Sequence, residues 1–185
     1  KNVSLQQMDL TQPSIIGPFD HIECYGVLMS LPDPAALLKV FAEKLSPTGT
    51  LRIMVYPHWG RQRINQLMQL ARLCGFSAAD PSHPRRFRKM IHALPLDHPL
   101  RRTFLNYLDA QNDAGLVDGF FHPSDRTFTA NALLQMAHQA GLQPAACFHR
   151  PWGNPVEMKQ NLNLDLPTWE MLDYLDVWQE LKSNL

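Results

Sequence analysis

The chain has 185 residues, of which 45% are hydrophobic and 18% are charged, and its formal net charge is +0. This length suffices for one well-packed core, and the composition is that of a globular protein rather than a disordered one. A balanced charge provides no overall field that attracts nucleic acid or an anionic membrane. No apolar run approaches the ~20 residues of a membrane-spanning helix. We therefore expect neither a membrane nor nucleic acid as a partner.

The three cysteines, Cys24, Cys74 and Cys147, are odd in number and have no paired spacing. They predict reduced thiols in a cytoplasmic protein rather than a disulfide framework or a zinc site. Histidines and cysteines nowhere form two pairs with ligand spacing, so we expect no metal.

Residues 2–11 alternate weakly between apolar and polar side chains, which predicts a strand that ends at Asp9. The alternative is that Asp9 is a solvated turn residue before Thr11-Gln12-Pro13.

Residues 19–56 predict the order strand, loop, helix, turn and strand. Phe19 to Tyr25 is prone to form a strand and stops at Gly26, and Asp33-Pro34 suits the start of a helix. The expected apolar face of that helix consists of Leu37, Leu38, Phe41 and Leu45. Residues 46–49 (SPTG) predict a turn, and the apolar run 51–55 predicts a strand buried on both faces.

Two strands joined by one helix are parallel and have a right-handed crossover. Ligands of such sheets bind beyond the carboxyl ends of the strands. Those ends are Tyr25–Leu28 and Tyr56–His58.

The segment FDHIECYGVLMSLPDP, followed by a helix and LSPTGTLRIMVY, resembles the second half of a class I S-adenosylmethionine-dependent methyltransferase. Members typically read FD-x-I, GVL, a polar or histidine pair, L-x-DP, and later L-x-P-G-G before a strand. Here Met29 and Ser30 occupy the places of the pair, and Thr48-Gly49 replaces Gly-Gly. The similarity covers about a third of the chain well.

This resemblance implies an α/β fold: a partial Rossmann-like methyltransferase sheet with a helical insertion after the fifth strand. It implies S-adenosylmethionine as the cofactor. In the family, an acidic residue after the third strand accepts a hydrogen bond from the adenine amino group, and the next backbone N–H faces a ring nitrogen. The cofactor-binding residues that the resemblance implies are Asp9, Leu10, Tyr25, Gly26, Val27 and Leu28.

Two parts of the family pattern are missing: the Gly-rich turn after the first strand and the acidic residue that grips the ribose. No G-x-G occurs in the sequence, and residue 1 is a lysine. We therefore expect the chain to be the carboxyl-terminal part of a larger enzyme whose amino-terminal part is missing here. The alternative is a reduced domain.

The expected organisation places the back half of the methyltransferase domain in residues 1–56 and 128–150. Residues 57–127 form a helical cap insertion, because a connection of this length is far above that of ordinary loops. Its three predicted helices are marked by Ile64, Leu67, Met68 and Ala71, by Phe87, Met90, Ile91 and Leu94, and by Leu100, Phe104, Leu105 and Leu108.

The last helix of the domain is predicted from a cap at Thr129 to a stop at Gly141, and a strand from Ala145 to Phe148 should follow it. Residues 151–185 form an extension with one amphipathic helix that begins near Thr168.

VYPHWGRQRI and, after the insert, FFHPSDRTFT resemble a subgroup of bacterial methyltransferases. The insert leaves the sheet at the first segment and returns at the second, so both should lie beside the methyl-donor site. The candidate substrate-binding residues are Tyr56, His58, Arg61, His122 and Asp125. The alternative is that Tyr56 and His122 only satisfy local backbone groups. His122 and Asp125 could also form an acid–base pair, but the sequence identifies no catalytic residue.

Residues 83–102 carry a basic stretch, which is either a solvated helix face or a surface for an anionic substrate or RNA. The leading function is methyl transfer from S-adenosylmethionine to an unknown acceptor, a small molecule or a protein. A non-catalytic interaction module that keeps half of the fold is the alternative. A nicotinamide-dependent enzyme has no support without G-x-G-x-x-G.

Overall fold

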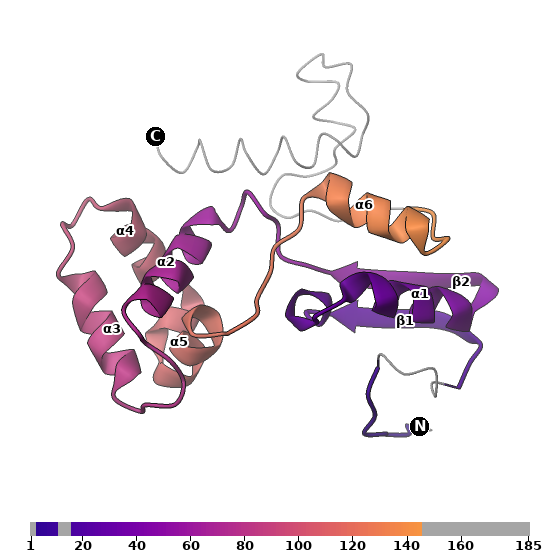
Figure 1. Ribbon diagram of the computed structural model, residues 1–185, viewed down its shortest axis with the longest axis horizontal. Coiled ribbons are helices and arrows are strands. Elements are labelled where there is room, and N and C mark those ends of the chain that lie inside the picture. Colours follow the sequence, from indigo (N-terminus) through magenta and orange to yellow (C-terminus); the bar gives the residue numbers. More distant parts are fainter. Residues whose placement is uncertain (1–2, 11–15, 146–185) are drawn as a thin grey trace, which may run out of the picture.

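Residues 19–54 form a parallel strand–helix–strand unit, as their sequence predicts. In the computed structural model, which describes residues 3–10 and 16–145, β1 (Phe19–Tyr25) pairs with β2 (Leu45–Met54), and α1 (Pro34–Lys44) connects them (Figure 1). The short 3₁₀ helix η1 (Leu28–Ser30) follows β1. The Asp33 side chain accepts a hydrogen bond from the Ala36 N–H at 3.0 Å, which fixes the start of α1 at Pro34.

Both strands present alternate side chains to one apolar core. Ile22 lies opposite Leu51, Cys24 lies opposite Ile53, and all four face the side of the sheet that packs against α1 and α6. The opposite face carries the exposed Arg52–Glu23 ion pair at 2.9 Å and the pair Tyr25 and Met54. The prediction of a strand buried on both faces is therefore wrong within the described residues, because no element among them covers that second face.

The segment 46–49 is part of β2 and not a separate turn. Phe19 pairs with Leu45 and His21 pairs with Thr50, so the extra residues of β2 form an irregularity in the ladder. Gly49 permits this path, because a Cβ there would lie 2.8 Å from the Phe19 carbonyl oxygen. Leu45 starts β2 and does not extend the face of α1.

The insert folds as a cluster of helices with its own core. All three predicted helices exist, as α2 (Gln62–Leu73), α3 (His83–His92) and α4 (Pro99–Asn106), but Leu94 and Leu108, which the prediction placed on the second and third, lie beyond their ends. The 3₁₀ helix η2 (Leu108–Gln111) and α5 (Asp113–Phe120) follow them and were not predicted. The buried aromatic rings of this core are Phe87, Phe104, Phe120 and Phe121. We call α2 to α5 with η2 the helix cluster.

The last described helix, α6 (Ala130–Gln139), returns to the sheet and packs against α1 (Figure 1). The Thr129 hydroxyl accepts from the Ala132 N–H at 3.1 Å, and Gly141 has φ +79° after the helix. Both predicted ends are thus confirmed. We call β1, β2, α1 and α6 the sheet unit. Ala145 is not in a strand, and the rest of the strand predicted there lies outside the described residues, as does the extension 151–185.

Residues 3–10 contain no strand, so the strand predicted to end at Asp9 is wrong for these residues. Val3 and Leu5 are exposed, and neither β1 nor β2 pairs with this segment. Weak alternation forms a strand only where a neighbouring strand satisfies its backbone groups. Leu10 lies in a turn and packs against the core of the sheet unit.

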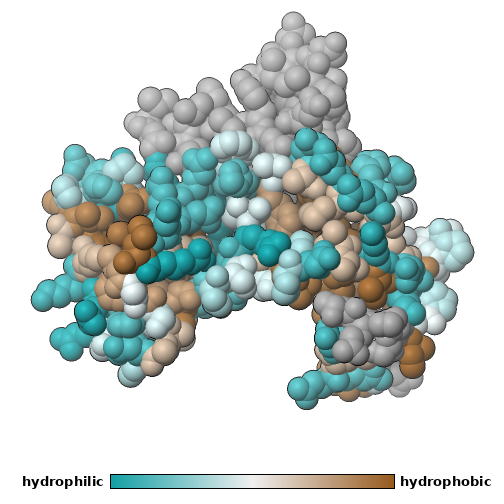
Figure 2. Space-filling view, in the orientation of Figure 1, coloured by the Kyte–Doolittle hydropathy of each residue, from teal (hydrophilic) through white to brown (hydrophobic). Residues whose placement is uncertain are grey.

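The sheet unit and the helix cluster have separate apolar cores and meet at a polar connection. Figure 2 shows hydrophilic residues along this connection, with apolar surface to either side. None of the helices in residues 3–10 and 16–145 has the length and apolar character that a bilayer crossing requires.

Candidate functional site

Two chain segments form the connection between the sheet unit and the helix cluster, and they lie side by side. The backbone N–H of Phe128 donates to the Tyr56 carbonyl, and the His58 N–H donates to the Phe128 carbonyl, both at 2.9 Å. We call the segments 56–61 and 121–128 the neck. The closeness predicted from the topology is confirmed, since Arg61 and Asp125 also form an ion pair.

Arg61 is the one charged residue classed as buried within the described part of the chain, with 8% of its surface exposed. Its guanidinium lies 3.5 Å from the centre of the Tyr56 ring. Nη1 donates to the Tyr107 hydroxyl at 3.2 Å, and Nη2 lies 3.6 Å from Asp125 Oδ2. Nε is buried and has no hydrogen-bond partner among the residues that the structure describes. Arg61 therefore joins the neck to the helix cluster and keeps one donor unused.

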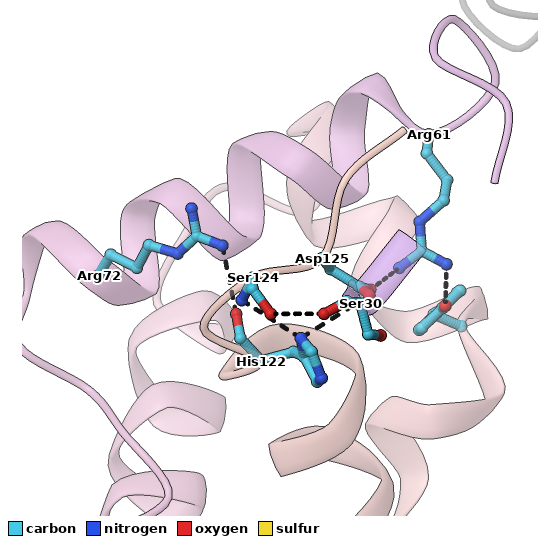
Figure 3. A network of polar contacts seen from close by, with 7 residues as sticks. Ser30, Arg61, Arg72, His122, Ser124 and Asp125 are labelled. Atoms are coloured by element: carbon cyan, nitrogen blue, oxygen red, sulfur yellow. Dashed lines mark hydrogen bonds and ion pairs between the residues drawn. The ribbon is translucent and has the colours of Figure 1, made fainter. Parts of the chain in front are cut away.

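Asp125 lies between Arg61 and His122, as Figure 3 shows. Its Oδ1 is 3.7 Å from His122 Nδ1, and the Ser124 N–H donates to the same nitrogen at 3.3 Å. The Ser124 hydroxyl donates to the Ser30 carbonyl at 3.4 Å, and the Arg126 N–H donates to the Met29 carbonyl at 3.2 Å. These bonds hold the neck against the loop that follows β1.

A cavity of about 120 Å³ lies where the neck, the end of β1 and the helix cluster meet, and we call it the central cavity. Its lining comes from the end of β1 and η1 (Gly26, Met29, Ser30), from the neck (Tyr56, Arg61, His122, Asp125) and from the helix cluster (Asp109, Asp118, Gly119). Gly26, with φ +73°, ends β1 there. The volume is below the ~300–1,000 Å³ of pockets that enclose whole ligands, so the central cavity can hold only a small group.

The lining is acidic, and Tyr107, which lies behind it in contact with Arg61, stays neutral. Three carboxylates face one guanidinium. Burial raises the pKa of Tyr107 most, Arg61 lowers it, and Asp109 raises it through charge and a hydrogen bond. Tyr107 therefore keeps its proton at neutral pH, accepts from Arg61 and interacts with Asp109.

The predicted cofactor residues are only partly brought to the central cavity. Gly26 lines it, whereas Tyr25 is 65% exposed at the end of β1 and the Leu28 side chain is buried in the sheet core. Val27 packs against that core. Asp9 and Leu10 stay a prediction, but the strand on which they depended is not formed.

Of the predicted substrate residues, the central cavity brings together Tyr56, Arg61, His122 and Asp125. His58 does not line it: its ring contacts Trp59, and its Nδ1 lies 3.1 Å from the Thr127 hydroxyl.

Sequence reasoning missed Asp109, Asp118 and Gly119. These residues belong to η2 and α5, which have no strong apolar periodicity. The sequence signal that could have predicted α5 is its amino-terminal cap, Asn112. Its side chain accepts from the Gly115 N–H at 2.8 Å.

Two arginines of the basic stretch 83–102 form contacts within the helix cluster. Arg88 pairs with Asp113 at 2.9 Å, and Arg101 donates to the Leu94 carbonyl at 2.6 Å. Within residues 3–10 and 16–145, no three histidine, cysteine or acidic side chains gather closely enough to hold a metal ion.

No protein-family model matches the chain. It is 32% identical over 145 residues to an uncharacterized protein of Synechococcus sp., and this similarity covers 76% of the chain. The same region is 35% of that protein, so the chain spans about a third of the length of the curated relative it matches.

Proposed function

We propose that the chain is the carboxyl-terminal part of an S-adenosylmethionine-dependent methyltransferase and that the central cavity receives the reacting end of the methyl acceptor. The observation that carries the proposal is the composition of the lining. Gly26 and Ser30, from the loop after a parallel strand, face Asp118 and His122 from the helical insert across one cavity. Ligand sites of parallel α/β sheets lie at this carboxyl edge.

The end of β1 has room for part of the cofactor. A Cβ built on Gly26 would meet only the Met54 methyl carbon, at 3.5 Å, and Tyr25 leaves its side chain exposed. The chain has no Gly-rich turn for the methionine and ribose parts, so these contacts belong to the proposed amino-terminal part. The length of the Synechococcus relative supports a longer protein.

Bound S-adenosylmethionine would supply a methyl group that is already activated by the sulfonium, so the protein mainly has to position the acceptor and exclude water. Arg61 and Asp125 would hold the neck, and the helix cluster would close the cavity over the strand ends. His122 would face the acceptor, and its ring would be positioned by Asp125 and by the Ser124 N–H, which donates to Nδ1.

The test is a calorimetric titration of S-adenosylmethionine into this chain and into the full-length protein. We expect the full-length protein to bind with micromolar affinity, and the chain to bind far more weakly because the Gly-rich turn is missing. Equally tight binding by the chain would contradict the division between two parts. Absence of binding by the full-length protein would refute the proposal that it is an S-adenosylmethionine-dependent methyltransferase.

The second candidate is a non-catalytic interaction module. One observation favours it: among the described residues, the sheet has two strands, and each keeps one edge without a neighbour. Unpaired strand edges accept a further strand from a partner. The same titration separates the two candidates, because a module of this kind does not need to bind the cofactor.

A further inference from the structure

One face of α3 carries positive charge that no described carboxylate neutralises by an ion pair. Arg85, Arg86 and Lys89 are exposed, and their spacing places them on the same side of the helix. Asp80, just before the helix, pairs with His83 instead, at 3.2 Å. Within residues 3–10 and 16–145, none of the three cations forms an ion pair. We call these three residues the basic face.

Two regions of opposite charge contribute to the chain's net charge of +0. Residues 57–127, which include the helix cluster, carry ten lysine and arginine side chains against six aspartates, an excess of four positive charges. The extension 151–185 lies outside the described residues, but its charges follow from its sequence. It carries six acidic side chains against two lysines, an excess of four negative charges. The two regions are therefore complementary in sign and equal in size.

The chemistry of the basic face suits acidic side chains better than single-stranded nucleic acid or a membrane. Single strands bind where bases stack on exposed aromatic rings, and Phe87, the aromatic residue of α3, is fully buried. A helix that binds a membrane surface also presents apolar side chains to it. The exposed residues of α3 are all basic, so this face has only charge to offer a partner.

We propose that the acidic extension, residues 151–185, docks on the basic face of α3 through ion pairs. Each exposed ion pair is weak and is screened by salt, so several must act together. The shared chain favours the contact, because a tethered segment has an effective concentration on the order of millimolar at its site. The extension would thereby close the basic face to other anions. This contact does not depend on the proposed methyl transfer.

Cys74 provides a native position for a probe of this contact. Its side chain is exposed, and its Sγ lies 3.9 Å from the Sδ of Met90, the residue after Lys89 in α3. Cys24 is buried, and Cys147→Ser removes the remaining thiol. A nitroxide attached to Cys74 in the 185-residue chain therefore lies beside the basic face. It broadens the NMR amide signals of any segment that docks there.

We expect the nitroxide to suppress amide signals of residues 151–185 at low salt. The signals should return at about 1 M salt, where the Debye length is about 3 Å. The double variant Arg85→Gln, Lys89→Gln should also restore most of the lost intensity, because glutamine removes the charge and keeps the helix propensity. The matched control is Lys39→Gln, Lys44→Gln, which removes the same charge from α1 and should leave the broadening unchanged.

Full signal intensity of the extension at low salt would overturn the proposal, as would a loss that persists at about 1 M salt. Restoration of the signals by the control variant as fully as by the α3 variant would also overturn it. A mixture of spin-labelled chain and isotopically labelled chain without nitroxide tests for a second copy. Loss of signal in this mixture would assign the basic face to that copy and would contradict docking within one chain.

Discussion

Arg61→Met is expected to lower the free energy of unfolding by about 3 kcal/mol, because it leaves Asp125 largely buried without its cation. The two side chains are only 10% and 12% exposed, and their charged atoms are 3.6 Å apart. The variant also removes the donor to Tyr107 and the cation above the Tyr56 ring. Urea unfolding of both proteins measures the difference.

Arg52→Met is the matched control, since Arg52 also pairs with a carboxylate but both side chains are more than half exposed. It should cost less than about 1 kcal/mol, as exposed ion pairs do. Adding Asp125→Asn to Arg61→Met should recover part of the loss, because no buried charge then lacks a partner. Equal small costs for Arg61→Met and Arg52→Met would show that Arg61 does not hold the neck.

Phe87→Ala is expected to cost about 4 kcal/mol, because the ring is fully buried at the centre of the helix cluster. Its neighbours in ring contact are Phe76, Phe104, Phe120 and Phe121. Since the helix cluster and the sheet unit have separate cores, hydrogen exchange should accelerate mainly in α2 to α5. Amide exchange measured by NMR tests both statements.

Leu73→Ala is the control for this second variant, because Leu73 lies in α2 but is 78% exposed. Its cost should stay within about 0.5 kcal/mol. If Phe87→Ala accelerated exchange in β1 and β2 as much as in α3, the two cores would be one cooperative unit, and the separation of the sheet unit from the helix cluster would be wrong.

The sequence predicted those elements whose local signals agree with their packing. Asp33 caps α1, and Thr129 caps α6. Leu67 in α2 and Phe87 in α3 each belong to a set of apolar residues at helical spacing, and the face that each set forms becomes buried. It failed where packing overrides the local signal. Gly115 and Gly119 weaken the helical pattern of α5, yet Gly115 has no room for a side chain, since its Cβ would lie 2.6 Å from the Asp109 carbonyl oxygen. The chain at 46–49 looks like a turn and is held in the β2 ladder.

The candidate site was predictable as far as topology determines it. An insert that leaves and re-enters at one sheet edge brings Arg61 to Asp125, whatever the substrate. The acidic wall was not predictable, because Asp109 and Asp118 reach the cavity through the packing of η2 and α5. His58 follows β2 more closely in sequence than Arg61 does, but its ring turns to Thr127.

The most direct test of a cofactor path at the end of β1 compares Gly26→Val with Gly75→Val in the full-length protein. The two glycines have φ of +73° and +72°, so the substitutions impose similar backbone strain. Gly75 follows α2 and lies outside the cavity lining, whereas Gly26 lies at the proposed path. We expect Gly26→Val to weaken S-adenosylmethionine binding by at least about tenfold, and Gly75→Val to leave it unchanged, in calorimetric titrations of protein whose folding is checked by thermal melts. Equal affinities of the two folded variants would contradict the site proposed here.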